Sequence, residues 1–142
     1  MRVLESSKEL DDLFAFEGKD VVVFFYTSAF KHDANQKIME RYARLAKHFA
    51  SRRIDSVQFV AYDFNVLGTT SHALNADLPN MHLSPAFQRD DSQFKKYFGE
   101  PTLDDMASYI KKHVDVKFQM KTRNLDPQSG PSMEELQAQV MQ

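Results

Sequence analysis

The sequence predicts an α/β fold, in which a mixed sheet of about four to five strands is flanked by about four helices. Residues 21–26 are continuously apolar and rich in β-branched and aromatic side chains, which is typical of a strand covered on both faces, and residues 56–63 are predicted to form a second buried strand. Between them, residues 33–51 carry apolar side chains at helical spacing. A strand, a long helix and a second buried strand in succession favour a parallel sheet. At 142 residues the chain is long enough for one domain with its own core.

The N-terminal part is predicted to contain a short strand and a helix. Val3 and Leu4 are apolar and form the strand. Ser6 and Glu9 have the spacing of a capping box, in which both side chains accept hydrogen bonds from amides at the start of a helix. Gly18 ends this helix. Its buried face consists of Leu10, Leu13 and Phe14.

The long helix and the second half of the chain complete the element order β-α-β-α-β-α-β-β-α. The apolar stripe of the long helix consists of Ile38, Tyr42, Leu45, Ala46 and Phe49. Residues 69–75 are predicted to form a short helix, and residues 80–83 and 93–98 two short strands in an antiparallel hairpin. Thr102 caps the last helix. The core face of this helix consists of Leu103, Met106, Ala107, Ile110 and Val114.

We divide the chain into a domain over residues 1–116 and a C-terminal extension over residues 117–142. The pattern fades after the last helix, and residues 126–131 contain the Pro, Ser and Gly of a turn. A short amphipathic helix is expected beyond this turn, with an apolar stripe made of Met133, Leu136, Val140 and Met141. A helix this short is not stable alone, so we expect it to lie on its own domain or on another chain.

The composition excludes several classes of function. The chain has no cysteine, which excludes disulfides, thiolate catalysis and cysteine-ligated metals. His72 and His82 lack metal-ligand spacing and are predicted to be ordinary polar residues, so no metal or cofactor is expected. The formal charge of -2 gives no pull toward nucleic acid, and no apolar run is long enough to span a membrane.

Several short motifs occur in the order typical of one family. Phe25 and Tyr26 end a buried strand, and the four residues Phe30, Lys31, His32 and Asp33 then precede a long helix. Residues 60–63 and 95–110 add further matches, and Leu78 and Pro79 stand before the predicted hairpin. Over residues 3–114 the chain resembles the catalytic domains of protein disulfide isomerases, which have the thioredoxin fold. The resemblance implies that Pro79 is the family's cis-proline.

The departures from this family concern its redox chemistry. Phe30, Lys31, His32 and Asp33 stand where the family has Cys-Gly-His-Cys, and disulfide exchange needs a thiolate. Phe24 stands where the family has a buried carboxylate that assists proton transfer. The resemblance therefore implies a domain without thiol chemistry and not an enzyme of that kind. His32 and Asp33 form a possible acid–base pair, but Asp33 suits the first turn of a helix better.

Three surfaces are candidates for binding another protein. Phe30, Leu78 and Pro79 are expected to flank the place where the family receives extended peptides, unless Phe30 folds down onto the helix. A second candidate is a basic stripe on the long helix, made of Lys37, Arg41 and Arg44, which either binds an acidic surface or is simply solvated. The apolar stripe of the tail helix is the third.

We interpret the chain as a redox-inactive, thioredoxin-like subunit of a larger protein assembly. The alternative is a non-catalytic, isomerase-like chaperone that binds unfolded peptides. A third hypothesis is an enzyme that uses the fold for non-thiol chemistry, such as glutathione conjugation. This is disfavoured because the chain lacks the large helical domain that usually completes such a site. The start and end of the chain show no secretory or retention signal, so we expect a cytosolic, cytoskeletal or organellar assembly. The lumen of the endoplasmic reticulum is the alternative compartment.

Overall fold

A five-stranded sheet forms the centre of the protein. The structure is a computed structural model and describes residues 1–15, 18–29, 33–68, 78–87 and 95–126. The strands lie in the order β1-β3-β2-β4-β5. They are β1 (Arg2–Val3), β2 (Asp20–Tyr26), β3 (Val57–Asp63), β4 (Asn80–Ser84) and β5 (Lys95–Lys96). The first three are parallel, while β4 is antiparallel to β2 and β5 is antiparallel to β4, which confirms the expected mixed sheet.

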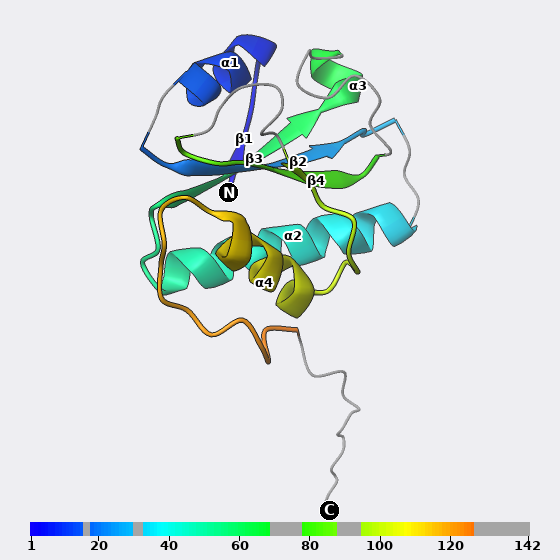
Figure 1. The fold of residues 1–142 in the computed structure, drawn as a ribbon. Coiled ribbons are helices and arrows are strands. Elements are labelled where there is room, and N and C mark those ends of the chain that lie inside the picture. The colour runs from blue at the N-terminus through cyan, green and yellow to red at the C-terminus, as the bar shows by residue number, and fades with distance from the viewer. Residues whose placement is uncertain (16–17, 30–32, 69–77, 88–94, 127–142) are drawn as a thin grey trace, which may run out of the picture.

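Helices cover both faces of this sheet. They are α1 (Ser7–Ala15), α2 (Asp33–Ser51), α3 (Phe64–Leu67) and α4 (Leu103–His113). Helices α1 and α3 lie on one face, and α2 and α4 lie on the other (Figure 1). The fold class predicted from the sequence, a mixed sheet between helices, is therefore confirmed within the described residues.

Strand β2 is buried on both faces because it lies between the two helical layers. Val22 and Phe24 point into the cluster that contains α2 and α4, and Val23 and Phe25 point into the cluster of α1 and α3. Alternate residues of a strand face opposite sides, so this run has no polar face and reads as continuously apolar. The hydroxyl of Tyr42 donates to the backbone oxygens of Val22 (3.0 Å) and Val60 (3.2 Å), which ties α2 to the two central strands.

The predicted helix caps are present. The amide of Glu9 donates to the Ser6 hydroxyl (3.3 Å), and the Glu9 carboxylate accepts from the amide of Glu5 (2.6 Å). This backbone hydrogen bond, together with the side chain of Arg2, lowers the pKa of Glu9. At α4 the Thr102 hydroxyl accepts from the Asp105 amide (3.2 Å).

Helix α3 was not predicted from the sequence. It is only four residues long, too short to show a helical period. Asp63 caps its start by accepting from the amide of Asn65 (3.0 Å), and Gly68 ends it with a φ of 78°. The helix expected over residues 69–75 lies outside the described residues, as does the start of the strand expected over residues 93–98.

The chain stays packed against the domain to its last described residue. Met120 and Leu125 are buried in the cluster of α2 and α4, so the first part of the predicted extension belongs to the folded body. The carboxylate of Asp126 accepts from the amides of Leu103 (2.7 Å) and Asp104 (3.2 Å) at the start of α4. In return, the Asp104 carboxylate accepts from the amide of Leu125 (2.7 Å). The tail helix expected around residues 133–141 lies outside the described residues.

A buried carboxylate holds the opposite end of the domain together. Asp20 is fully buried at the start of β2. Its oxygens accept from the amides of Ala86 (2.9 Å), Asp115 (2.8 Å) and Val116 (3.0 Å). One side chain therefore joins the central strand to the segment after β4 and to the segment after α4.

Candidate functional site

A hollow of about 210 Å³ lies beside Pro79 at the start of β4. The peptide bond between Leu78 and Pro79 is cis, as the resemblance to the isomerases implies. Phe98 is 84% exposed and belongs to the lining of this hollow. The described lining residues include no charged side chain; they are Phe24, Ile38, Pro79, Asn80, Met81, Tyr97, Phe98, Gly99, Pro101 and Met106. Such a surface suits an apolar side chain of a bound segment.

Phe24 reaches this hollow from the core. It lies opposite Met81 in the pairing of β2 with β4 and is only 2% exposed. Its ring stacks on Tyr42 at 4.3 Å and on Tyr26 at 6.1 Å between ring centroids. Phe24, at the position where the resembled family has a carboxylate, is thus packed between two other aromatic rings. Phe24 has no titratable group, and burial raises the pKa of Tyr26 and, more strongly, that of Tyr42, so both hydroxyls keep their protons at neutral pH.

A short loop that contains Gly99 closes the hollow on the Phe98 side. The Tyr97 hydroxyl donates to the backbone oxygen of Glu100, so the ring lies across the loop. A Cβ atom at Gly99 would overlap this ring. Glycine at this position therefore lets Tyr97 close the loop and leaves Phe98 pointing outward.

The loop that follows β2 is held by β3 and α3. The amide of Ser28 donates to the Asp63 carboxylate (3.0 Å), which also caps α3. The side-chain amide of Asn65 donates to the Ser28 hydroxyl (3.0 Å). Asp63 is only 7% exposed, so its carboxylate has lost most of its contact with water. The hydrogen bonds from the amides of Ser28 and Asn65 compensate for this loss. Sequence reasoning missed this carboxylate, although an aspartate as the last residue of a buried strand was the signal for it.

No protein-family model matches the chain, and no curated protein matches it. Among solved structures it is similar to Fasciola hepatica thioredoxin, with a TM-score of 0.56 and 20% identity over 80% of this chain and 99% of that one. It is also similar to human ERp44 in its zinc-bound form (TM-score 0.60) and to full-length ERdj5 (TM-score 0.62), each at 14% identity. These matches cover 78% and 80% of this chain but only 30% and 16% of the two larger proteins.

The chain has the thioredoxin fold. The sequence identities are low, so the similarity concerns the fold alone. The order and directions of the strands agree with this assignment, and so does the cis peptide bond before Pro79. The resemblance inferred from short motifs is therefore confirmed for the thioredoxin fold.

Most of the motif that departs from the family lies outside the described residues. Phe30, Lys31 and His32 are outside the described residues. Asp33 is the first residue of α2, but its side chain is also outside the described part. The replacement of the two cysteines and the position of Phe30 beside the peptide-binding place therefore stay predictions.

The basic stripe of this thioredoxin-fold domain has one member with a contact inside the domain. Lys37, Arg41 and Arg44 are all exposed on α2. Arg41 donates from Nη1 to the backbone oxygen of Pro101 (3.2 Å), which ties α2 to the loop before α4. A role of the stripe in binding an acidic partner stays a prediction. Arg41 therefore lies near the Pro79 hollow, because Pro101 also lines that hollow.

His82 differs from the ordinary polar residue that the sequence predicts. It is 6% exposed on β4, and its ring meets the ring of Phe25 edge-on at 4.9 Å between centroids. Burial, and then the charge of Lys96, lowers the pKa of His82 to about 4.

Among the described residues, no group of three or more histidine or acidic side chains is placed to hold a metal ion. In the same part of the chain, no helix is both long enough and apolar enough to cross a membrane.

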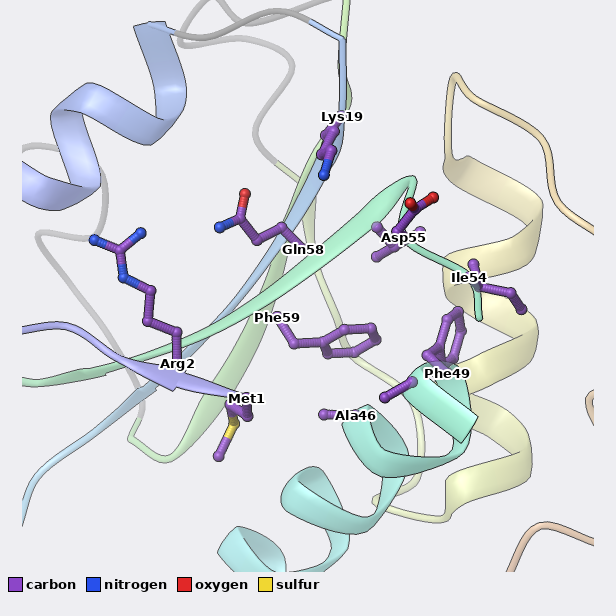
Figure 2. A pocket seen from close by; sticks show the side chains of 11 residues that line it. Met1, Arg2, Lys19, Ala46, Phe49, Ile54, Asp55, Gln58 and Phe59 are labelled. Carbon is purple, nitrogen blue, oxygen red and sulfur yellow. The ribbon is translucent and has the colours of Figure 1, made fainter. Parts of the chain in front are cut away.

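A second hollow, of about 270 Å³, opens at the other end of the sheet. Figure 2 shows Phe49 and Phe59 side by side within it, with Lys19 and Asp55 at its margin. Phe49 is 1% exposed and Phe59 is 7% exposed, so both rings are core side chains. Arg2 also lines this hollow, but its guanidinium is already paired with Glu9. This hollow is therefore an opening onto the core, and we assign it no function.

Proposed function

We propose that this protein is a redox-inactive thioredoxin-like module that binds a segment of another protein at the Pro79 hollow, as a subunit of a larger assembly. One observation carries the proposal: a hollow whose described lining is largely apolar and uncharged lies beside Pro79 in a chain without cysteine. In the resembled family, this place receives extended peptides. The site keeps a surface for binding but has no group that can form a mixed disulfide.

The chemistry of the lining supports binding over catalysis. Disulfide exchange proceeds through attack by a thiolate, which this chain cannot supply. Phe24 stands at the position where the resembled family has a proton-transferring carboxylate, and its buried ring has no titratable atom. Two separate requirements of the redox reaction are thus unmet, so we propose that the protein is not an enzyme of this type.

Binding at the Pro79 hollow would combine backbone pairing with burial of an apolar side chain. The residues of β4 already pair with β2 and β5, so the backbone of Leu78 and Pro79, which precedes β4, would be the part that pairs with an extended partner. Phe98 would be covered by the partner, and removing so exposed an aromatic ring from water favours the complex. Specificity would come from the shape of the hollow, because the described residues of its lining carry no charge.

A matched pair of phenylalanines tests this proposal. Phe98→Ser removes the ring at the hollow, whereas Phe87→Ser removes a ring that is 61% exposed at the far end of β4. Binding to an array of unrelated extended peptides with apolar side chains is measured for both variants. We expect Phe98→Ser to weaken binding roughly tenfold and Phe87→Ser to leave it unchanged. No binding by the unmodified protein, or equal loss in both variants, would contradict the proposal.

Redox inactivity is tested separately. An insulin-reduction assay with dithiothreitol should proceed at the rate without protein, because the chain has no thiolate. A catalysed rate from the purified chain would overturn this part of the proposal. This result is independent of whether peptides bind, so the two parts can fail separately.

A chaperone is the second candidate, and the uncharged lining favours it. A hollow without charge does not select against particular sequences, which is useful for binding many unfolded clients. A chaperone should suppress aggregation of a denatured client, and Phe98→Ser should weaken this effect. A subunit of an assembly should instead co-purify from native extract with one partner at constant stoichiometry.

A further inference from the structure

A second surface begins on the other side of Phe98. It is an open hollow of about 390 Å³ between the loop after β5 and helix α4. We call it the Phe98 groove and define it by Lys96, Tyr97, Phe98, Gly99, Tyr109 and Lys112. The rings of Tyr97 and Tyr109 meet edge-on at 5.1 Å between centroids and form its floor. An aromatic surface of this kind on a soluble domain indicates a contact that the described residues do not supply.

The groove has a basic end and an acidic end. Lys112 lies near the end of α4, and Lys96 lies over the Phe98 ring with its Nζ atom 5.3 Å from the ring centroid. At the start of α4, Glu100 and Asp105 belong to the same lining. An occupant with its negative charge at the Lys96 and Lys112 end would match this distribution.

The last described residue lies at the acidic end of the groove. Asp126 is held by the amides of Leu103 and Asp104, directly before Asp105 in the lining. Residues 127–132 can extend roughly 20 Å, whereas Asp105 and Lys112 are about 10 Å apart along a helix. The chain beyond Asp126 is therefore long enough to reach either end of the groove.

The sequence of the remaining chain fits the groove in both polarity and charge. Residues 127–142 contain two acidic residues, Glu134 and Glu135, and no lysine or arginine. Both acids stand at the start of the predicted tail helix, whose apolar stripe is made of Met133, Leu136, Val140 and Met141. A helix this short needs a surface to be stable, and an apolar stripe of this kind packs well on aromatic rings.

We propose that residues 133–142 dock on the Phe98 groove of the same molecule as an amphipathic helix. The apolar stripe covers Phe98 and Tyr109. Glu134 and Glu135 face the basic end of the groove. This docking does not depend on the proposed function, but it adds regulation to it. Because Phe98 also lines the Pro79 hollow, a docked tail competes with a partner segment bound there.

The absence of cysteine makes a direct test possible, because a single engineered cysteine carries one label. In the full chain, Ala138→Cys places a nitroxide on the side of the predicted helix opposite its apolar stripe. The backbone amide signals of isotope-labelled protein are then compared with the nitroxide oxidised and reduced. We expect the amides of Phe98, Tyr109 and Lys112 to lose most of their intensity. Amides of α1, on the other face of the sheet, should keep theirs (Figure 1).

Two matched tail variants show whether the contact is the one proposed. Leu136→Asp together with Val140→Asp should restore the signals of the groove, because the apolar stripe is interrupted by charge. Gln128→Asp together with Gln139→Asp adds the same charge but keeps the stripe, so the signal loss should persist. If both double variants behave alike, the apolar contact proposed here is wrong.

A mixing experiment separates docking within one molecule from docking between two. Isotope-labelled protein without a nitroxide is mixed with unlabelled Ala138→Cys protein that carries one. Docking within one molecule predicts no signal loss at the groove in this mixture. Signal loss at the groove in the mixture would assign the tail to a second copy. In the first experiment, with the nitroxide on the isotope-labelled protein itself, no signal loss or a uniform loss would exclude docking on the groove. Each of these results overturns the proposal, and none depends on peptide binding at the Pro79 hollow.

Discussion

His82 makes the stability of the domain depend on pH, and its environment gives the size of the effect. Burial, and then the charge of Lys96, lowers the pKa of His82 from 6.5 to about 4. In the unfolded chain the ring binds a proton near pH 6.5, whereas in the folded domain it does so only near pH 4. The folded state therefore loses stability progressively as the pH falls from about 6.5 to about 4, and the loss reaches about 3 kcal/mol.

The variant that tests this reasoning is His82→Leu, which fills the buried position with an apolar side chain that does not titrate. Denaturant unfolding is followed by circular dichroism at several pH values between 7.5 and 4.5. Carboxylates also titrate in this range, so the informative quantity is the difference in unfolding free energy between the two proteins. This difference should change by about 2 kcal/mol or more across the range, in favour of His82→Leu at low pH.

A control separates titration from simple loss of packing. Leu83→Ala removes a fully buried neighbour of His82 and should lower the unfolding free energy by about 3 kcal/mol. Because leucine does not titrate, this loss should be the same at every pH. If the unfolding free energies of His82→Leu and the unmodified protein stay parallel down to pH 4.5, the assignment of a low pKa to buried His82 is wrong.

Three further predictions concern the hydrogen bonds that hold the fold together. Asp20→Ala leaves three backbone amides without their acceptor and should lower the unfolding free energy by about 3 kcal/mol or more. The change is measured by denaturant titration, and a loss under about 1 kcal/mol would contradict the role of Asp20. Asp126→Ala removes the acceptor at the start of α4, so it should lower the unfolding free energy by about 1 kcal/mol and speed amide exchange at Leu103. Unchanged exchange at Leu103 would show that this hydrogen bond contributes nothing. Tyr42→Phe removes only the hydroxyl that donates to β2 and β3 and should cost about 1 kcal/mol in the same titration, with equal stability as the contrary result.

The elements that the sequence predicts well are those with a strong local pattern. Strand β2 and helix α2 were placed almost to the residue, because a doubly covered strand is apolar throughout and a long amphipathic helix repeats its stripe several times. The caps at Ser6 and Thr102 were also found, since both partners of each cap lie within one turn of helix. Helix α3 was missed because it is shorter than the pattern that would reveal it.

The residues that sequence reasoning missed act over long separations. Asp20 joins segments that are 66 and more than 90 residues further along the chain, and Asp63 holds Ser28 from 35 residues away. The Asp126 carboxylate accepts from the Asp104 amide and the Asp104 carboxylate accepts from the Leu125 amide, each across more than 20 residues, and both bonds keep the chain packed beyond the predicted end of the domain. No local period or motif contains such pairs, because each carboxylate looks like any surface acid until the chain has folded.

The sequence alone determined that this chain has no thiolate, and its periodicities determined the order of strands and helices. Both follow from local chemistry: a missing side chain cannot be supplied by folding, and apolar periods specify which faces are buried. Only the tertiary structure decided that His82 is buried, that Phe98 is exposed, and that an uncharged hollow lies beside Pro79. Exposure and cavities arise from how distant segments pack, and a residue's type does not fix its neighbours in space.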